Sequence, residues 1–224
     1  MGDEVRMIGV CGMGGIGKTT IMKHINNRLL KESERFDKVI WVTISKELNI
    51  FRLQKDIADS LKQSLPEDDE LQRASALKDI LEGQRYVLIL DDVWKRFSLL
   101  DVGIPDPTFG MGRKVVLTSR SIKVCQYMDC KVVKVQPLSK IESMNLFLDH
   151  VGHSVVQNQN LKDIVHKIVE QCGGLPLSIV TIAGSMKGVN DICEWRNALI
   201  ELEEHVKSVE GSDVEIFERL RFCD

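Results

Sequence analysis

The chain has 224 residues, of which 43% are hydrophobic and 28% are charged, and its formal net charge is −3. This length and balance suit an α/β domain with a smaller appended domain, and the small negative charge argues against binding nucleic acid or an anionic membrane. No apolar run reaches the roughly 20 residues that a membrane-spanning helix needs, and the acidic N-terminus is unlike a signal peptide. The six scattered cysteines are expected to be reduced, which indicates a cytoplasmic protein.

The first predicted elements are a strand over residues 7–11, a glycine-rich loop, and a helix over residues 20–30. The loop fits the pattern G-x-x-x-x-G-K-[ST] in full, and its residues are Gly12, Met13, Gly14, Gly15, Ile16, Gly17, Lys18 and Thr19. Its glycines let the backbone wrap phosphate oxygens, while the loop amides and the helix N-terminus attract the anion. Lys18 is expected to reach the β- and γ-phosphates, and the Thr19 hydroxyl to ligate Mg²⁺. A glycine-rich turn with a solvated lysine is the alternative, which the order of strand, loop and helix disfavours.

Four further strands and two helices are predicted between residue 38 and residue 135. Short runs rich in β-branched residues place the strands at residues 38–44, 86–90, 114–118 and 131–135. Apolar residues at helical spacing place helices at residues 50–65 and 71–82. Strands that alternate with helices form right-handed βαβ units, so we expect an α/β fold with a parallel five-stranded sheet.

Polar residues follow two of these strands, at the edge of the sheet where ligands bind in such folds. Asp91 and Asp92 end the strand at residues 86–90. Asp91 is expected to hold Mg²⁺ and Asp92 to orient or deprotonate an attacking water. Arg120 follows the next strand, and its planar guanidinium is suited to sense a γ-phosphate. The alternatives are a pair of turn aspartates and a surface arginine that caps a helix.

After residue 135 the pattern is helical throughout. Ser139 and Glu142 form a capping box that begins a helix. Apolar stripes predict further helices over residues 161–169, 176–187 and 192–206. Gly173 and Gly174 end the first of these, and Pro176 suits the first turn of the next.

Several other residue types admit two interpretations. Trp41 and Trp94 are expected to pack in cores rather than to stack on a base. His150 and His153 are expected to face solvent rather than to bind a metal, since no further ligands lie nearby in the sequence.

Six motifs in a fixed order closely resemble the NB-ARC domain of plant intracellular immune receptors, which are nucleotide-binding, leucine-rich-repeat proteins. The motifs occupy residues 12–19, 36–42, 90–94, 117–120, 137–139 and 172–177. Trp94, after the acidic pair, resembles the coiled-coil subclass rather than the TIR subclass. The resemblance covers nearly the whole chain.

This resemblance implies an ADP/ATP switch for disease resistance, in which ADP holds the domain closed and exchange for ATP opens it and drives self-oligomerisation. By similarity, residues 12–19 and Thr20 cradle the phosphates, and Asp91 holds Mg²⁺. Asp92 resembles the catalytic acid and Arg120 the sensor arginine. Pro176 resembles the proline that packs against the nucleoside. ATP hydrolysis, if present, is expected to be slow.

The resemblance also implies a domain organisation. We expect a P-loop nucleotide-binding domain at residues 1–136, a helical subdomain called ARC1 at residues 137–212, and the start of a winged-helix subdomain at residues 213–224. The upstream adenine-binding segment, most of the winged-helix subdomain, the coiled coil and the leucine-rich repeats are expected to be missing from this sequence. In the full-length receptor, the last two would be intramolecular partners.

Two rival functions remain open. A metabolic P-loop kinase would need an acceptor pocket and an arginine-rich lid, and no arginine cluster of that kind occurs in the sequence. A scaffold that works without nucleotide would be expected to lose Lys18 or Asp91, and both residues are intact.

Overall fold

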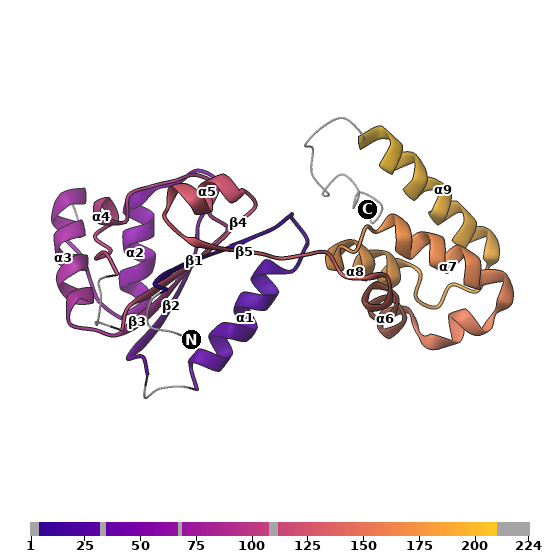
Figure 1. Cartoon of the computed structure of the whole chain (residues 1–224), viewed down its shortest axis with the longest axis horizontal. Helices are drawn as coiled ribbons and strands as arrows, with labels where there is room; N and C mark the ends of the chain where they lie inside the picture. The colour runs from indigo at the N-terminus through magenta and orange to yellow at the C-terminus, as the bar shows by residue number, and fades with distance from the viewer. Residues whose placement is uncertain (1–4, 32–34, 67–68, 108–111, 210–224) are drawn as a thin grey trace. The chain divides into compact units, whose positions relative to one another are not determined.

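A computed structural model describes residues 5–31, 35–66, 69–107 and 112–209 of the chain (Figure 1). The contacts between its residues divide the chain into two compact units. The first unit consists of residues 1–12 and 18–135, and the second of residues 13–17 and 136–224. The expected start of a winged-helix subdomain, at residues 213–224, lies outside the described residues.

The first unit is built on five parallel strands in the order β2-β3-β4-β1-β5, which confirms the predicted sheet. The strands are β1 (Met7–Cys11), β2 (Lys38–Thr43), β3 (Tyr86–Asp91), β4 (Lys114–Ser119) and β5 (Lys131–Lys134). All six residues of β3 are buried, as expected of a strand covered on both faces. Because the strands are parallel and adjacent, the carboxyl ends of β1, β4 and β3 lie side by side at one edge.

Helices cover both faces of this sheet (Figure 1). They are α1 (Lys18–Leu29), α2 (Ile50–Ser60), α3 (Glu70–Glu82), α4 (Leu99–Val102) and α5 (Ile122–Tyr127). Val87 and Ile89 of β3 pack with Met22 of α1 in one apolar cluster. Leu88, which points to the opposite face, belongs to a second cluster with Ile57 of α2. The alternation of side chains along a strand therefore divides the core into two layers.

Helix α2 is shorter than its sequence pattern predicts, and two short helices were not predicted. The apolar spacing continues to Leu65, but α2 ends at Ser60. Lys62 there takes a left-handed conformation (φ 57°), and the Gln63 amide donates to the Ala58 carbonyl, which closes the helix end. Helices α4 and α5 have four and six residues, too few to show a 3.6-residue period.

The second unit is helical, as predicted. It contains α6 (Lys140–Val151), the 3-10 turn η1 (His153–Gln157), α7 (Gln159–Gln171), α8 (Pro176–Ser185) and α9 (Ile192–Val209). The predicted capping box is confirmed: the Glu142 amide donates to Ser139 Oγ, and the Ser139 amide donates to the Glu142 carboxylate. Pro176 is the first residue of α8, also as predicted. The core of the unit contains Trp195, whose ring meets that of Phe147 edge to face at 6.4 Å.

The turn between α7 and α8 yields a prediction on stability. Gly174 has a φ of 71°, and an added Cβ would lie 2.5 Å from the Leu138 carbonyl oxygen and 2.9 Å from Pro137 Cβ. Gly174→Ala would therefore combine backbone strain with a clash against main-chain atoms. We expect it to lower the free energy of unfolding by about 3 kcal/mol or more, measured by thermal or urea unfolding.

The neighbouring glycine is a matched control for this clash. Gly173 also has a positive φ, 60°, but an added Cβ there would meet no atom within 4 Å. Gly173→Ala should therefore cost only the left-handed backbone penalty, about 1 kcal/mol. Equal losses for the two variants would contradict the close approach of Gly174 to the segment before α6.

A second prediction concerns acid stability at the amino end of β2. The Arg85 side chain and amide donate to the Asp37 carboxylate, at 2.7 Å for the shortest contact, and the Asp37 amide donates to the Arg85 carbonyl. The hydrogen bond from the Arg85 side chain, and next that from its amide, lower the pKa of Asp37 to about 2. A depressed pKa means that this contribution is present above the ordinary value of 3.8 and is lost as the pH falls toward 2.

We therefore expect the unfolding temperature of Asp37→Asn to be below that of the wild type at pH 6. The difference should shrink between about pH 4 and pH 2, where the wild-type carboxylate becomes protonated. Asp79→Asn, which changes an exposed residue of α3, is the control. A wild-type and Asp37→Asn difference that does not change with pH would contradict the ion pair.

Candidate functional site

The loop after β1 has the strand, loop and helix order that its sequence pattern requires. β1 ends at Cys11 and α1 begins at Lys18. Gly15 and Gly17 have φ angles of 74° and 94°, a region that side chains with a Cβ rarely adopt. An added Cβ at Gly17 would meet no atom within 4 Å. The glycine there is required by its conformation, and the space beside it is open.

Lys18 is a buried cation, with 7% of its surface exposed. Its Nζ donates to the Gly12 carbonyl at 2.8 Å. Burial, and next the Arg120 guanidinium, lower the pKa of Lys18, although the carboxylates of Asp92 and Asp91 act in the opposite direction. A bound phosphate would add negative charge and favour the ammonium form. The surroundings of Lys18 therefore fit an anionic ligand.

Asp91, at the end of β3, is hydrogen-bonded both to α1, the helix after the loop, and to the end of β4. It is the last residue of β3, with 3% of its surface exposed. Thr19 Oγ1 donates to this carboxylate at 3.1 Å, and Thr118 Oγ1 donates to it at 2.7 Å. The structure thus places next to each other the two residues that the sequence predicts for Mg²⁺, Thr19 and Asp91.

The donors at this point are hydroxyl and carboxylate oxygens, which Mg²⁺ prefers. In the described part of the chain, no group of three or more His, Cys, Asp or Glu side chains could hold a metal ion. Mg²⁺ at nucleotide sites is bound by one or two protein groups together with phosphate and water oxygens. The Thr19 and Asp91 pair fits that mode of binding.

Asp92 lies at the same edge, in a left-handed conformation with a φ of 62°, which aspartate tolerates better than most residues. Its amide donates to Thr118 Oγ1 at 2.8 Å. Its carboxylate accepts a hydrogen bond from Trp94 Nε1 at 3.0 Å and lies 4.0 Å from Arg120 Nε. The Asp92 and Arg120 side chains are 37% and 26% exposed, so both can be reached from solvent.

Trp94 differs from its expected packing role. Trp41 does pack against an apolar cluster, the one that contains Ile89 of the neighbouring strand. Instead, the Arg120 guanidinium lies over the Trp94 ring, 4.6 Å from its centre, and the Lys46 ammonium lies 5.2 Å from the centre. The sequence places Trp94 two residues after Asp92 but gives no sign of its contacts with Arg120 and Lys46.

The remaining predicted site residues lie in two places. Thr20 is exposed in the first turn of α1. Pro176 begins α8 in the second unit, where the amide of the following Leu177 donates to the Gly15 carbonyl at 3.1 Å. Gly15 belongs to the loop segment, residues 13–17, that groups with this unit. The contact of Pro176 with a nucleoside stays a prediction.

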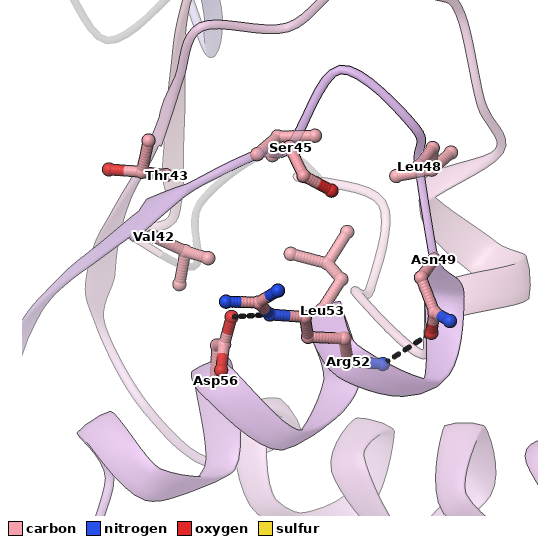
Figure 2. A pocket seen from close by; sticks show the side chains of 9 residues that line it. Val42, Thr43, Ser45, Leu48, Asn49, Arg52, Leu53 and Asp56 are labelled. Carbon is pink, nitrogen blue, oxygen red and sulfur yellow. Dashed lines mark hydrogen bonds and ion pairs between the residues drawn. The ribbon is translucent and has the colours of Figure 1, made fainter.

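Other candidate sites are small or already satisfied. A hollow beside the carboxyl end of β2 (Figure 2) has room for about one water molecule, far less than a small-molecule ligand needs. Its polar groups serve α2: Asn49 caps the helix by accepting from the Arg52 amide, and the Arg52 side chain pairs with Asp56 at 3.8 Å. His150 and His153 are exposed, and His153 lies 3.5 Å from Asp149.

The five cysteines within the described residues are free thiols. Burial raises the pKa of Cys125 to about 11 and that of Cys130 to about 12. Both side chains therefore stay protonated near neutral pH, where a thiol is a weak nucleophile.

A parallel sheet with a complete G-x-x-x-x-G-K-T loop after β1 and a buried aspartate at the end of β3 defines a P-loop nucleotide-binding protein. The family model of the NB-ARC domain matches residues 1–157. The chain therefore belongs to the NB-ARC family.

Curated relatives agree with this assignment. The chain is 34% identical over 224 residues to the probable disease resistance protein At5g43730 of Arabidopsis thaliana, covering 98% of the chain and 26% of the relative. It is 37% identical over 225 residues to the probable disease resistance protein At5g47250 of the same plant, with the same coverage. The chain spans about a quarter of the length of these relatives.

A solved structure supports the fold. The ORC2 protein of Aeropyrum pernix, determined as ADPNP and ADP complexes, superposes with a TM-score of 0.53 at 18% identity. The match covers 96% of this chain and 60% of that one.

Within the described residues, no helix is long and apolar enough to cross a membrane.

Proposed function

We propose that this chain is the ADP/ATP-binding switch core of a plant intracellular immune receptor that acts in the cytoplasm in disease resistance. In this proposal, residues 1–136 form the nucleotide-binding domain and residues 137–212 the ARC1 subdomain. ATP hydrolysis is slow at most and secondary to switching. Family membership and the disease resistance relatives support this proposal.

The observation that carries the proposal is the hydrogen bond that joins α1, the helix after the phosphate loop, to the end of β3. Lys18 is a buried cation at the phosphate loop, and the next residue, Thr19, is hydrogen-bonded to the buried carboxylate of Asp91. A nucleotide needs both features: a cation for the β- and γ-phosphates, and oxygen ligands for the Mg²⁺ that accompanies them. A scaffold that works without nucleotide has no use for this arrangement. A P-loop kinase would share it, and family membership argues against that rival.

The residues of the site would divide the work as follows. Lys18 and the loop amides bind the phosphates, and Thr19 and Asp91 hold Mg²⁺, which neutralises phosphate charge when bound. Asp92 accepts a proton from an attacking water, and Arg120 senses the terminal phosphate. The ORC2 structure with ADPNP and ADP supports an adenine nucleotide as the ligand.

The rest of the receptor is part of the same proposal. The disease resistance relatives are about four times as long as this chain. In the full-length protein, a coiled coil and leucine-rich repeats would contact the core, and ATP would promote self-oligomerisation. Whether ADP or ATP occupies the site would then determine whether the receptor oligomerises.

Nucleotide analysis of the purified chain tests the proposal. The protein is denatured, and mass spectrometry identifies any nucleotide released. Nucleotide-free protein is then melted with Mg·ADP, Mg·ATP or Mg·GTP, and a ligand that binds the folded state raises the unfolding temperature. We expect the adenine nucleotides to stabilise the chain more than GTP. No shift with any nucleotide would favour the scaffold, and rapid turnover with a small-molecule acceptor would favour the kinase.

A further inference from the structure

One side chain at the carboxyl edge of the sheet contacts both of the groups proposed to meet the terminal phosphate. Trp94 Nε1 donates to Asp92 Oδ2 at 3.0 Å. The Arg120 guanidinium lies over the face of the same indole ring, 4.6 Å from its centre. Asp92 and Arg120 also form a direct ion pair, with Arg120 Nε 4.0 Å from Asp92 Oδ1. The indole therefore contacts both members of this ion pair.

The segment that carries Trp94 is held firmly at this edge. After β3, the Asp92 amide donates to Thr118 Oγ1 and the Val93 amide donates to the Thr118 carbonyl, both at 2.8 Å. Ser119 Oγ donates to the Val93 carbonyl at 2.7 Å. These bonds fix the backbone on both sides of Asp92 to the end of β4. The indole thus projects from an ordered turn.

The chemistry of the ring suits both contacts. An indole N–H is a donor only, so it matches a carboxylate oxygen. The indole face attracts cations more strongly than the faces of Tyr and Phe do, and Lys46, 5.2 Å from the ring centre, adds a second positive charge there. Trp94 belongs to none of the apolar clusters formed by the described residues. Its hydrogen bond to Asp92 and its two cation–π contacts are with charged groups.

We propose that Trp94 is a positioning residue, whose indole holds the Asp92 carboxylate and the Arg120 guanidinium in a fixed relation at the nucleotide site. This role rests on the proposed function, because it takes Arg120 as the group that senses the terminal phosphate. Trp94 itself touches no reacting atom. Its loss should impair recognition of a triphosphate more than that of a diphosphate.

The contacts can be tested first without nucleotide, by NMR of the indole N–H groups. The chain has three tryptophans, and Trp41→Phe and Trp94→Phe assign their signals. We expect Asp92→Asn and Arg120→Gln each to move the Trp94 signal by more than its line width and to leave the Trp195 signal in place. A Trp94 signal that neither substitution moves would overturn the proposal.

Binding measurements then test the positioning role. Trp94→Leu removes the N–H donor and the ring, and we expect it to weaken binding of a non-hydrolysable ATP analogue about fivefold, with ADP affinity changed less than about twofold. Trp94→Phe keeps a ring for Arg120 and should recover part of the loss. Trp41→Phe is the matched control, because it removes an indole N–H bond to Thr43 at 3.3 Å instead. It should change neither affinity.

The outcomes separate this proposal from the proposed function. Suppose that the wild type binds nucleotide. If Trp94→Leu then weakened binding of the analogue and of ADP equally, or weakened neither, the positioning role alone would be overturned. A chain that binds no nucleotide, yet shows the NMR shifts, would overturn the proposed function and reduce Trp94 to a structural contact. Unfolding curves of each variant confirm that the comparison is made between folded proteins.

Discussion

Lys18→Ala should weaken binding of both ADP and ATP about a hundredfold or more. The ammonium is the buried cation of the loop, and charge-assisted bonds to phosphate are about twice as strong as neutral ones. Each such bond contributes about 1.5–3 kcal/mol, so two account for a hundredfold loss. Isothermal titration calorimetry with Mg·ADP and Mg·ATP measures the change.

The same substitution should leave the nucleotide-free chain folded. The pKa of Lys18 is lowered, chiefly by burial, so its charge near neutral pH disfavours the folded state without nucleotide. Removing that charge offsets the lost hydrogen bond to Gly12. Lys18→Met, which keeps most of the side-chain stem, should have an unfolding temperature equal to or above that of the wild type.

Lys23→Ala is the control for these variants, since Lys23 is an exposed lysine of the same helix, α1. It should change neither nucleotide affinity nor stability. If Lys18→Ala bound ADP as tightly as Lys23→Ala, the phosphate loop assignment would be wrong.

The main features of the fold could be predicted because short stretches of the sequence determine them. The strands β1 to β5 are short β-branched runs, and the capping box of Ser139 and Glu142 uses two residues at fixed spacing. The loop at residues 12–19 combines glycine, lysine and threonine at spacings that few other structures require. In each case, the residues that determine the structure are close together in the sequence.

The parts that could not be predicted depend on contacts between distant residues. Trp94 contacts Arg120, 26 positions away, and Lys46, 48 positions away, because β2, β3 and β4 end at one edge of the sheet. The early end of α2 follows from the left-handed Lys62, which no apolar spacing reveals. The hydroxyl of Thr118, absent from the predicted site, bonds to both Asp91 and the Asp92 amide for the same topological reason.

The second large effect is expected for Asp91→Asn, which should remove the Mg²⁺ dependence of ATP binding. In the wild type, Mg²⁺ should increase ATP affinity at least about tenfold, because Thr19 and Asp91 would hold the ion and the ion would neutralise phosphate charge. Asparagine keeps the shape of the side chain but lacks the negative charge. We expect Mg²⁺ to change the ATP affinity of this variant less than about threefold.

The result with EDTA in place of Mg²⁺ distinguishes loss of the metal from loss of the fold. A carboxylate near phosphates repels them when no cation intervenes, so Asp91→Asn should bind ATP in EDTA as well as the wild type, or better. Asp92→Asn is the neighbouring control: it should keep the Mg²⁺ dependence and slow hydrolysis by about 10²–10⁴-fold if Asp92 is the base. Calorimetry and phosphate release measure the two properties. If Asp91→Asn kept the full Mg²⁺ effect and Asp92→Asn lost it, the roles of the two aspartates would be exchanged. The hydrogen bond from Thr19 to Asp91 would then not mark the metal site.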